Sequence, residues 1–222
     1  MLTFNSLDEI RLAFETEDPE TVMYWASNFW RQAAVENRED AKQLLMEIAD
    51  NFPDLRSSCF AWLHDFPDPT LALFFLKYIR DEHGDTAAIY ALMEFGQKGV
   101  LGPDDPSVVK PLMELLALDQ KATNEPVLAA LLALKAASAI DLIAGFLDHP
   151  HPAIRMEAMR CVILLSRLAH RDDLLEKAVP FLNDPHPATR LAAAINLKKE
   201  YPERFPDIDV NKYIDDVTNP KK

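Results

Sequence analysis

The motif DHPHPAI at residues 148–154 returns 35 residues later as NDPHPAT at residues 183–189, and DFPDPTL at residues 65–71 follows the same pattern. Each copy has an acid or amide followed by two prolines one residue apart, and each lies between two amphipathic segments. The first proline stops the preceding helix, and the second suits the first turn of the next helix, where an N–H would have no partner. A helix pair recurring at this interval is typical of an α-solenoid.

Helix start signals occur along the rest of the chain. Ser6 and Glu9 have the spacing of a capping box, and the Asp-Pro pairs beginning at Asp18, Asp68 and Asp105 each place a capping acid before a proline. No segment shows sustained alternation of apolar and polar residues, so the sequence predicts an all-α fold of roughly 11–13 helices. The expected helices span residues 6–16, 19–35, 38–51, 53–65, 69–82, 86–96, 106–118, 125–137, 139–148, 152–169, 172–182 and 187–199.

The C-terminal part of this pattern resembles the HEAT-repeat family. The resemblance is strongest over residues 139–199, in IDLIAGFLDHPHPAIRMEAMRCVILLSRLA followed by LLEKAVPFLNDPHPATRLAAAINLKK. HEAT repeats typically carry an aspartate in the inter-helix turn and an arginine six residues later, and these residues pair along the stack. Asp184 and Arg190 match both positions. In the preceding repeat Arg155 matches, but His149 stands at the aspartate position.

The resemblance implies an α-solenoid of antiparallel helix pairs over residues 1–200, with Asp184, Arg190 and Arg155 as structural residues. In the turn at 65–71 both ladder positions differ, because Phe66 and Ala72 stand there. The loop QKGVLGPDD at 97–105 interrupts the alternation of helices and suggests a break in the stack. Residues 201–222 leave the repeat, and 209–217 could form a short helix that caps the last apolar face.

Charge and aromatic residues are distributed unevenly between the two halves. The formal charge is −13, of which residues 1–110 carry −11 and residues 111–222 carry −2. Fifteen of the twenty aromatic residues precede residue 96. Aromatic anchors beside acidic groups are what a basic protein partner would need. The same net charge opposes nucleic-acid binding, because phosphate backbones are repelled.

Helical-wheel positions select candidate contact residues in this N-terminal half. In 19–35 the buried stripe centres on Val22, Ala26, Phe29 and Ala33, and the opposite side is polar apart from one tyrosine. The segment 69–82 is apolar around most of its circumference. The candidate partner-binding residues are Tyr24, Asn28 and Arg31 on the first helix, and Lys77, Arg80, Asp81 and Glu82 towards the end of the second.

The sequence holds no recognisable catalytic, phosphate-binding or metal-binding motif. His149, His151 and His186 alternate with prolines in repeat linkers, so neither a metal nor another cofactor is expected. HEAT-like di-iron hydroxylases use His-Glu dipeptides, which this chain lacks. HEAT-containing bilin lyases offer no distinguishing motif for comparison.

These observations favour a non-enzymatic, acidic HEAT-like module that binds another protein, either as an adaptor or as a neutralising, immunity-type partner of a basic protein. The alternative is a HEAT-like alkylpurine DNA glycosylase or DNA-binding relative, which the acidic charge opposes. A structural scaffold without a charged partner also fits.

The same features bear on where the protein acts. The N-terminus, MLTFNSLDEIRL, has neither the basic nor the apolar region of a signal peptide, and no apolar run is long enough to cross a membrane. Cys59 and Cys161 are expected to be buried thiols. We therefore expect a cytoplasmic monomer.

Overall fold

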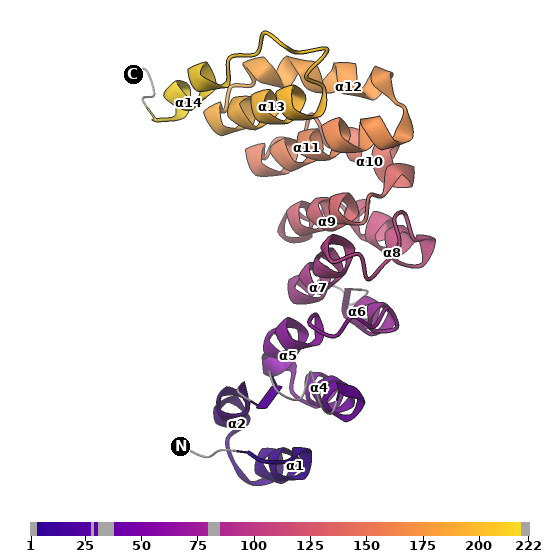
Figure 1. Cartoon of the computed structure of the whole chain (residues 1–222), viewed down its shortest axis with the longest axis vertical. Coiled ribbons are helices and arrows are strands. Elements are labelled where there is room, and N and C mark those ends of the chain that lie inside the picture. The colour runs from indigo at the N-terminus through magenta and orange to yellow at the C-terminus, as the bar shows by residue number, and fades with distance from the viewer. Residues whose placement is uncertain (1–3, 28, 31–37, 80–84, 219–222) are drawn as a thin grey trace. The chain divides into compact units, whose positions relative to one another are not determined.

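The computed structural model describes residues 4–27, 29–30, 38–79 and 85–218, and every regular element in these ranges is helical (Figure 1). They contain thirteen α-helices, three short 3₁₀ helices and no strand. The all-α prediction is therefore confirmed for the described part of the chain. Asn28, Arg31, Arg80, Asp81 and Glu82, which the sequence selects as contact residues, lie outside it.

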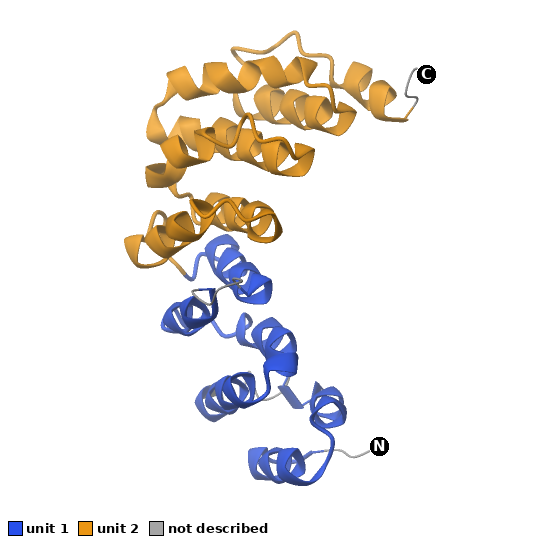
Figure 2. Ribbon diagram, turned by 180° about the vertical axis from the view of Figure 1, so that it is seen from behind, with its two compact units in different colours: residues 1–100 blue, residues 101–222 orange. Residues whose placement is uncertain are grey.

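The chain divides into two compact units, residues 1–100 and residues 101–222, which we call unit 1 and unit 2 (Figure 2). The division falls inside the segment 97–105, where the sequence predicts a break. Unit 1 contains α1 (Leu7–Thr16), α2 (Pro19–Trp25), α4 (Arg38–Asn51), η1 (Pro53–Leu55), α5 (Arg56–Leu63), α6 (Leu71–Ile79) and α7 (Thr86–Gln97). Unit 2 contains α8 (Pro106–Leu116), α9 (Lys121–Ala133), η2 (Ala137–Ala139), α10 (Ile140–Ala144), α11 (Pro152–Ala169), α12 (Asp172–Ala178), η3 (Val179–Asn183), α13 (Pro187–Glu200) and α14 (Val210–Thr218).

The predicted capping side chains lie where the sequence places them. Ser6 Oγ accepts the Glu9 N–H at 3.2 Å, and Asp18 Oδ2 accepts the Thr21 N–H at 2.9 Å. Asp105 caps α8 in the same way, and Asp68 accepts the Thr70 N–H just before α6. Asp85 caps α7 as well. Each of these acceptors satisfies an N–H that the helix itself cannot pair, so the helix starts are fixed by local sequence.

Several predicted helices differ from those observed. The segments 53–65 and 172–182 are each divided into a 3₁₀ and an α-helical part, and 139–148 is α-helical only over Ile140–Ala144. Two further differences concern 19–35 and 125–137. The segment 19–35 is not one continuous helix, because α2 ends at Trp25 and the chain turns at Ala26 before helical residues resume. The segment 125–137 starts four residues early, at Lys121. Asn124 Nδ2 donates to Asp119 Oδ1 at 2.7 Å, and this bond stabilises an additional first turn ahead of Pro126. A proline near a helix start therefore need not mark its first residue.

Within each unit, a helix packs against its immediate neighbours and against a helix of the next pair. In unit 1, α4 packs on α5, α6 packs on α7, and α5 contacts α7. In unit 2, α11 packs between α9 and α13, and α13 also contacts α14. The contacts of α5 with α7, and of α11 with α9 and α13, join helices that are one pair apart in the sequence. Stacked helix pairs require contacts of this kind.

The two cores differ in composition. In unit 1 an aromatic cluster forms between α5, α6 and α7, in which Phe60 lies 5.3 Å from Phe75 and Phe75 lies 5.5 Å from Phe95, measured between ring centroids. Phe74 and Tyr78 complete it. The unit 2 core is mainly aliphatic, with fully buried residues such as Leu128, Leu131, Ile143, Val162, Leu165 and Leu197. The cysteines are free and buried as predicted, with Cys59 in unit 1 and Cys161 in unit 2.

The C-terminal segment packs on the last long helix of unit 2. Tyr201 is buried and its hydroxyl donates to the Ile163 carbonyl at 3.2 Å. Lys198 Nζ donates to the Ile208 carbonyl at 2.6 Å, and α14 contacts α13. The helix expected at 209–217 is thus observed at Val210–Thr218.

Candidate functional site

The main candidate site is a surface on α2, α5 and α7 of unit 1. Tyr24 on α2 is 74% exposed and Tyr90 on α7 is 50% exposed, while Trp62 on α5 is partly exposed. Exposed aromatic side chains are costly to leave in water and are over-represented where proteins bind one another. Two pockets accompany these residues, one on each side of α5.

The first pocket, which we call the acidic pocket, lies between α2 and the η1–α5 segment and has a volume of about 380 Å³. The rings of Tyr24 and Trp62 line it, together with the carboxylates of Glu20 and Asp54. Its remaining lining residues are Met23, Ser27, Leu55 and Ser58. Aromatic faces beside carboxylates attract cations from two directions at once.

The second pocket, which we call the apolar pocket, lies between α5 and α7 and has a volume of about 300 Å³. Glu94 and His64 lie at this pocket among mostly small or apolar residues. The other lining residues are Ser57, Phe60, Ala61, Ala87, Tyr90, Ala91 and Met93. A pocket of this composition suits an apolar side chain.

Helical periodicity explains why α5 serves both pockets. Ser58 and Trp62 are four residues apart and face α2, whereas Ser57, Ala61 and His64 follow the same three- and four-residue spacing on the side facing α7. Where the two rows adjoin, Ser57, Ser58 and Ala61 are exposed, and all three side chains are small. A backbone could therefore approach this helix closely.

The acids of the two pockets are unpaired, which sets them apart from other acids of unit 1. Glu20, Asp54 and Glu94 make no side-chain hydrogen bond or ion pair with any residue that the structure describes. By contrast, Asp68 pairs with Lys42 and Asp65 pairs with Lys98. The pocket carboxylates are thus available to a cationic ligand.

The sequence-predicted contact residues are only partly brought together here. Tyr24 lines the acidic pocket, in agreement with its predicted exposure. Lys77 on α6 pairs instead with Asp50, lies 5.2 Å above the Tyr78 ring, and lines neither pocket. Trp62, Tyr90 and the three unpaired acids were missed, because their proximity depends on how α5 packs beside its neighbours. The feature of the sequence that could have indicated this surface is the group of small residues Ser57, Ser58 and Ala61 on α5.

The predicted structural residues form a ladder in unit 2. Arg155 binds Asp184 with both ends of its guanidinium, Nε to Oδ2 at 2.9 Å and Nη2 to Oδ1 at 3.2 Å. Arg155 Nη1 also donates to the His149 carbonyl at 2.9 Å. Arg190 makes the equivalent contacts one repeat later, donating to the Asp184 carbonyl at 2.9 Å and to Asp216 Oδ2 at 3.2 Å. Each arginine therefore ties its own turn to the next element.

Burial and hydrogen bonding act on Asp184 in opposite directions. Burial alone would raise the pKa of this carboxyl, but hydrogen bonds from Arg155 and from the His186 N–H lower it below its ordinary value. In the preceding inter-helix turn, His149 stands at the position that Asp184 occupies in the later one. Its Nε2 lies 3.4 Å from Asp119 Oδ1. The acid of this ladder is therefore paired and buried, unlike the unpaired carboxylates of the acidic pocket.

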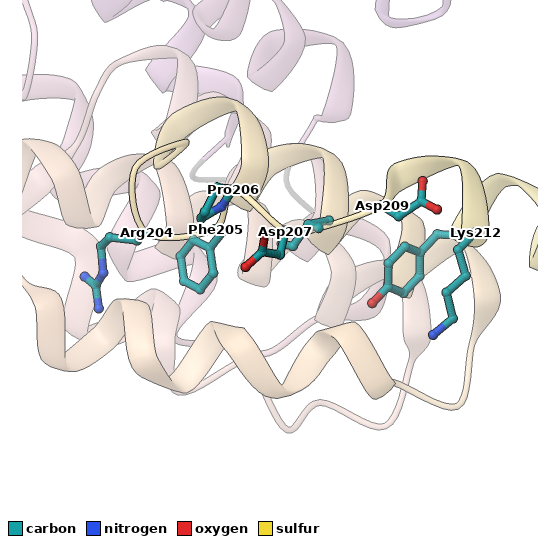
Figure 3. Close-up of a pocket in the computed structure, with 8 residues that line it drawn as sticks. Arg204, Phe205, Pro206, Asp207, Asp209 and Lys212 are labelled. Atoms are coloured by element: carbon teal, nitrogen blue, oxygen red, sulfur yellow. The ribbon is translucent and has the colours of Figure 1, made fainter.

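A further pocket of about 350 Å³ lies along the C-terminal segment (Figure 3). Its lining includes the charged residues Arg204, Asp207, Asp209 and Lys212 and the aromatic residues Phe205 and Tyr213. Its charged side chains are of both signs in equal number, so it has no electrostatic preference. Arg204 is moreover engaged with Asp172 and Glu176 on α12. These contacts hold the segment against unit 2.

Several kinds of chemistry find no support in the described ranges. Burial raises the pKa of Cys59 to about 12 and that of Cys161 well above its ordinary value, so both thiols are poor nucleophiles at neutral pH. No group of three or more His, Cys, Asp or Glu residues that could hold a metal ion occurs among the described residues. None of the described helices is both long and apolar enough to cross a membrane.

Comparison of the chain with family models, with curated proteins and with solved structures finds no match.

Proposed function

We propose that the chain is a non-enzymatic HEAT-like α-solenoid that binds a basic protein through unit 1. The proposed solenoid is supported by the packing of α5 on α7, of α9 on α11 and of α11 on α13, each one helix pair apart. It is also supported by the Arg155 and Arg190 contacts, which repeat at 35 residues. The role would be that of an adaptor or of a neutralising, immunity-type partner, acting as a monomer in the reducing cytoplasm.

One observation carries the binding function: exposed aromatic residues and unpaired carboxylates occur together on α2, α5 and α7. Unit 1 has 18 acidic and 8 basic residues, a net charge of −10, whereas unit 2 has 18 and 15, a net charge of −3. Opposite charges accelerate encounter, and the aromatic side chains supply the contact area that holds the complex. The association rate should therefore fall as salt rises, since salt screens charges over about 8–10 Å.

The test compares two charge-reversal variants of equal charge change. The first changes Glu20, Asp54 and Glu94 of unit 1 to lysine, and the second changes Glu114, Glu203 and Asp215 of unit 2, which are exposed acids without a side-chain partner among the described residues. A partner captured from native lysate and identified by mass spectrometry supplies the binding assay. We expect association at low salt to slow at least tenfold for the unit 1 variant and less than twofold for the other. Equal effects, or rates indifferent to salt, would contradict the proposal.

A further inference from the structure

The two pockets differ in chemistry and flank the exposed side of one helix, α5. The acidic pocket has two unpaired carboxylates, two aromatic rings and two serine hydroxyls. The apolar pocket is lined by Phe60, Tyr90, Met93 and three alanines, with one unpaired acid, Glu94. A ligand that fills both must present a cation to the first and an apolar group to the second.

The cation that fits the acidic pocket is an arginine or lysine side chain. A guanidinium or ammonium group can lie on the face of Tyr24, which is 74% exposed, while it donates to Glu20 or Asp54. Inorganic cations fit less well, because half of the lining is aromatic or aliphatic rather than oxygen. Nucleic acid is excluded by the unpaired carboxylates on both sides of α5.

The separation of the pockets sets the spacing of the two side chains. They lie on either side of α5, so their centres are about one helix–helix distance apart, roughly 8–10 Å. An extended chain advances about 3.3 Å per residue, so the two side chains would be two to four residues apart. The small residues Ser57, Ser58 and Ala61 on the exposed side of α5 leave room for the connecting backbone.

We propose that the α2–α5–α7 surface binds an extended basic segment of the partner, with an arginine or lysine in the acidic pocket and an apolar side chain, two to four residues away, in the apolar pocket. This inference deepens the proposed function and rests on it, since it assigns the contact to one surface and one class of peptide. The carboxylates of Glu20 and Asp54 select the cation. Tyr90 and the other residues of the apolar pocket select the apolar side chain.

The experiment uses a phage library of random twelve-residue peptides panned against the full chain. We expect the enriched peptides to share an arginine or lysine with a leucine, isoleucine, methionine or phenylalanine two to four residues away. The best peptide is then synthesised with a fluorescein label, and its Kd is measured by fluorescence anisotropy. Replacing its basic residue with glutamate should abolish binding.

Variants of the protein locate the contact. Glu20→Gln combined with Asp54→Asn, and separately Tyr90→Ala, should each weaken peptide binding at least tenfold. The matched controls in unit 2, Glu114→Gln with Glu203→Gln and Leu168→Ala, should change the Kd less than twofold. All of these side chains are at least half exposed or unpaired, so circular dichroism should show every variant to be folded.

Three outcomes would overturn the inference: no enrichment, enrichment of peptides without a basic residue, or a Kd indifferent to the pocket substitutions. None of them decides the broader function. If the captured partner still associates in a salt-dependent way with the unit 1 acids, while the pocket variants bind it normally, unit 1 binds a protein through another surface. If both experiments fail, the proposed function fails with the inference.

Discussion

Unit 1 and unit 2 are built from similar helix pairs, but they connect neighbouring pairs by different means. In unit 2 the half-buried arginine of one turn binds the aspartate of the next, as Arg155 does with Asp184. In unit 1 the positions that correspond in the DFPDPTL turn are Phe66 and Ala72, and an aromatic cluster around Phe75 joins α5, α6 and α7 instead. Unit 2 adds the arginine contacts to an aliphatic core, whereas in unit 1 an aromatic cluster stands at the corresponding place.

This difference has a consequence for the surface. In unit 2 many acids are neutralised by arginine, as Asp141 is by Arg171 and Asp172 by Arg204. Unit 1 has fewer basic residues to pair with as many acids, so carboxylates such as Glu20 and Glu94 remain unpaired with any described residue. Among the described residues, the unit with fewer basic residues is the one that keeps unpaired carboxylates on its surface.

The sharpest way to break unit 2 is to remove one partner of its ladder. Asp184→Ala should lower the free energy of unfolding by about 3–5 kcal/mol, because it leaves the guanidinium of Arg155 unpaired at a half-buried position. This exceeds the roughly 0.5–2 kcal/mol that loss of a cap alone would cost. Urea denaturation followed by far-ultraviolet circular dichroism measures the change.

A matched variant in unit 1 tests whether the large loss of stability expected for Asp184→Ala is due to the burial of the ion pair. Asp65→Ala removes the partner of Lys98 in an exposed pair and should cost less than about 1 kcal/mol. If Asp184→Ala costs no more than Asp65→Ala, the ladder does not stabilise unit 2.

In unit 1, the counterpart of breaking the Arg155–Asp184 contact is a substitution that weakens the aromatic cluster. Phe75→Leu should cost about 2 kcal/mol, since it removes the ring contacts with Phe60 and Phe95 and leaves a small cavity. Phe181→Leu in unit 2 is the control, because Phe181 makes no ring contact with another aromatic residue in the described ranges. Equal losses for the two variants would show that ring pairing is unimportant. Urea titration of both proteins at pH 7 provides the comparison.

Acid should act on unit 1 through the pair of Lys42 and Asp68. The hydrogen bond from Lys42, with that from Thr70, lowers the pKa of Asp68 from 3.8 to about 2. The folded carboxyl therefore resists protonation, and its stabilising contribution is present above pH 4 and is lost as pH falls from about 4 to about 2. The contribution is about 1 kcal/mol, because Asp68 remains partly solvated.

Measuring the free energy of unfolding between pH 5 and pH 2 tests whether this stabilisation is lost as pH falls. Lys42→Met should reduce stability at pH 5 by about that amount and flatten the fall towards pH 2. Lys98→Met, in an exposed pair, should leave the slope of the wild-type curve unchanged. A Lys42→Met protein whose stability falls as steeply as the wild type would show that the pair is not the acid-sensitive group.

The smallest effect concerns backbone strain, which is also distributed unequally. All non-glycine residues with φ in the left-handed region among the described residues lie in unit 2: Asp104, Asp119, Lys135 and His170. His170 ends α11 with φ of 52°. His170→Gly should raise the free energy of unfolding by about 0.5 kcal/mol, since relief of strain slightly exceeds the entropy that glycine loses. Ala117→Gly, at φ of −66°, should instead lower it, and a melting curve distinguishes the two.

Much of the fold could be predicted from the sequence, because its helix starts are encoded locally. Asp18, Asp85 and Asp105 each cap the helix that they precede, whatever packs above them. The turn at Ala26 could not be predicted, because a helical wheel assumes one continuous helix. Trp30 does not belong to the buried stripe that the wheel gives for 19–35, yet it is almost fully buried.

The candidate site was less predictable, because most of it depends on packing between helices and not on the pattern within one helix. Tyr24 is exposed on its own helix, so local periodicity identified it. Trp62 and Tyr90 belong to a common surface only because α5 contacts α7, and no local pattern encodes that contact. The partner of Asp184 is 29 residues away, and only the resemblance to HEAT repeats suggested that such a pairing exists.

The arginine contacts of unit 2 also define a length of chain that can be copied. Arg155 and Arg190 each bind the carbonyls six and five residues before them and a carboxylate 29 or 26 residues after them. A tandem duplication of residues 150–184, inserted directly after Asp184, would supply a new arginine with the two carbonyls behind it and the carboxylate ahead of it. Insertions of 35 residues, or of multiples of 35, therefore preserve the partners of each arginine, whereas other lengths leave a half-buried guanidinium without its acid. Unit 2 is in this sense extensible in whole modules, a property that protein engineers could use to lengthen it without redesigning its interior.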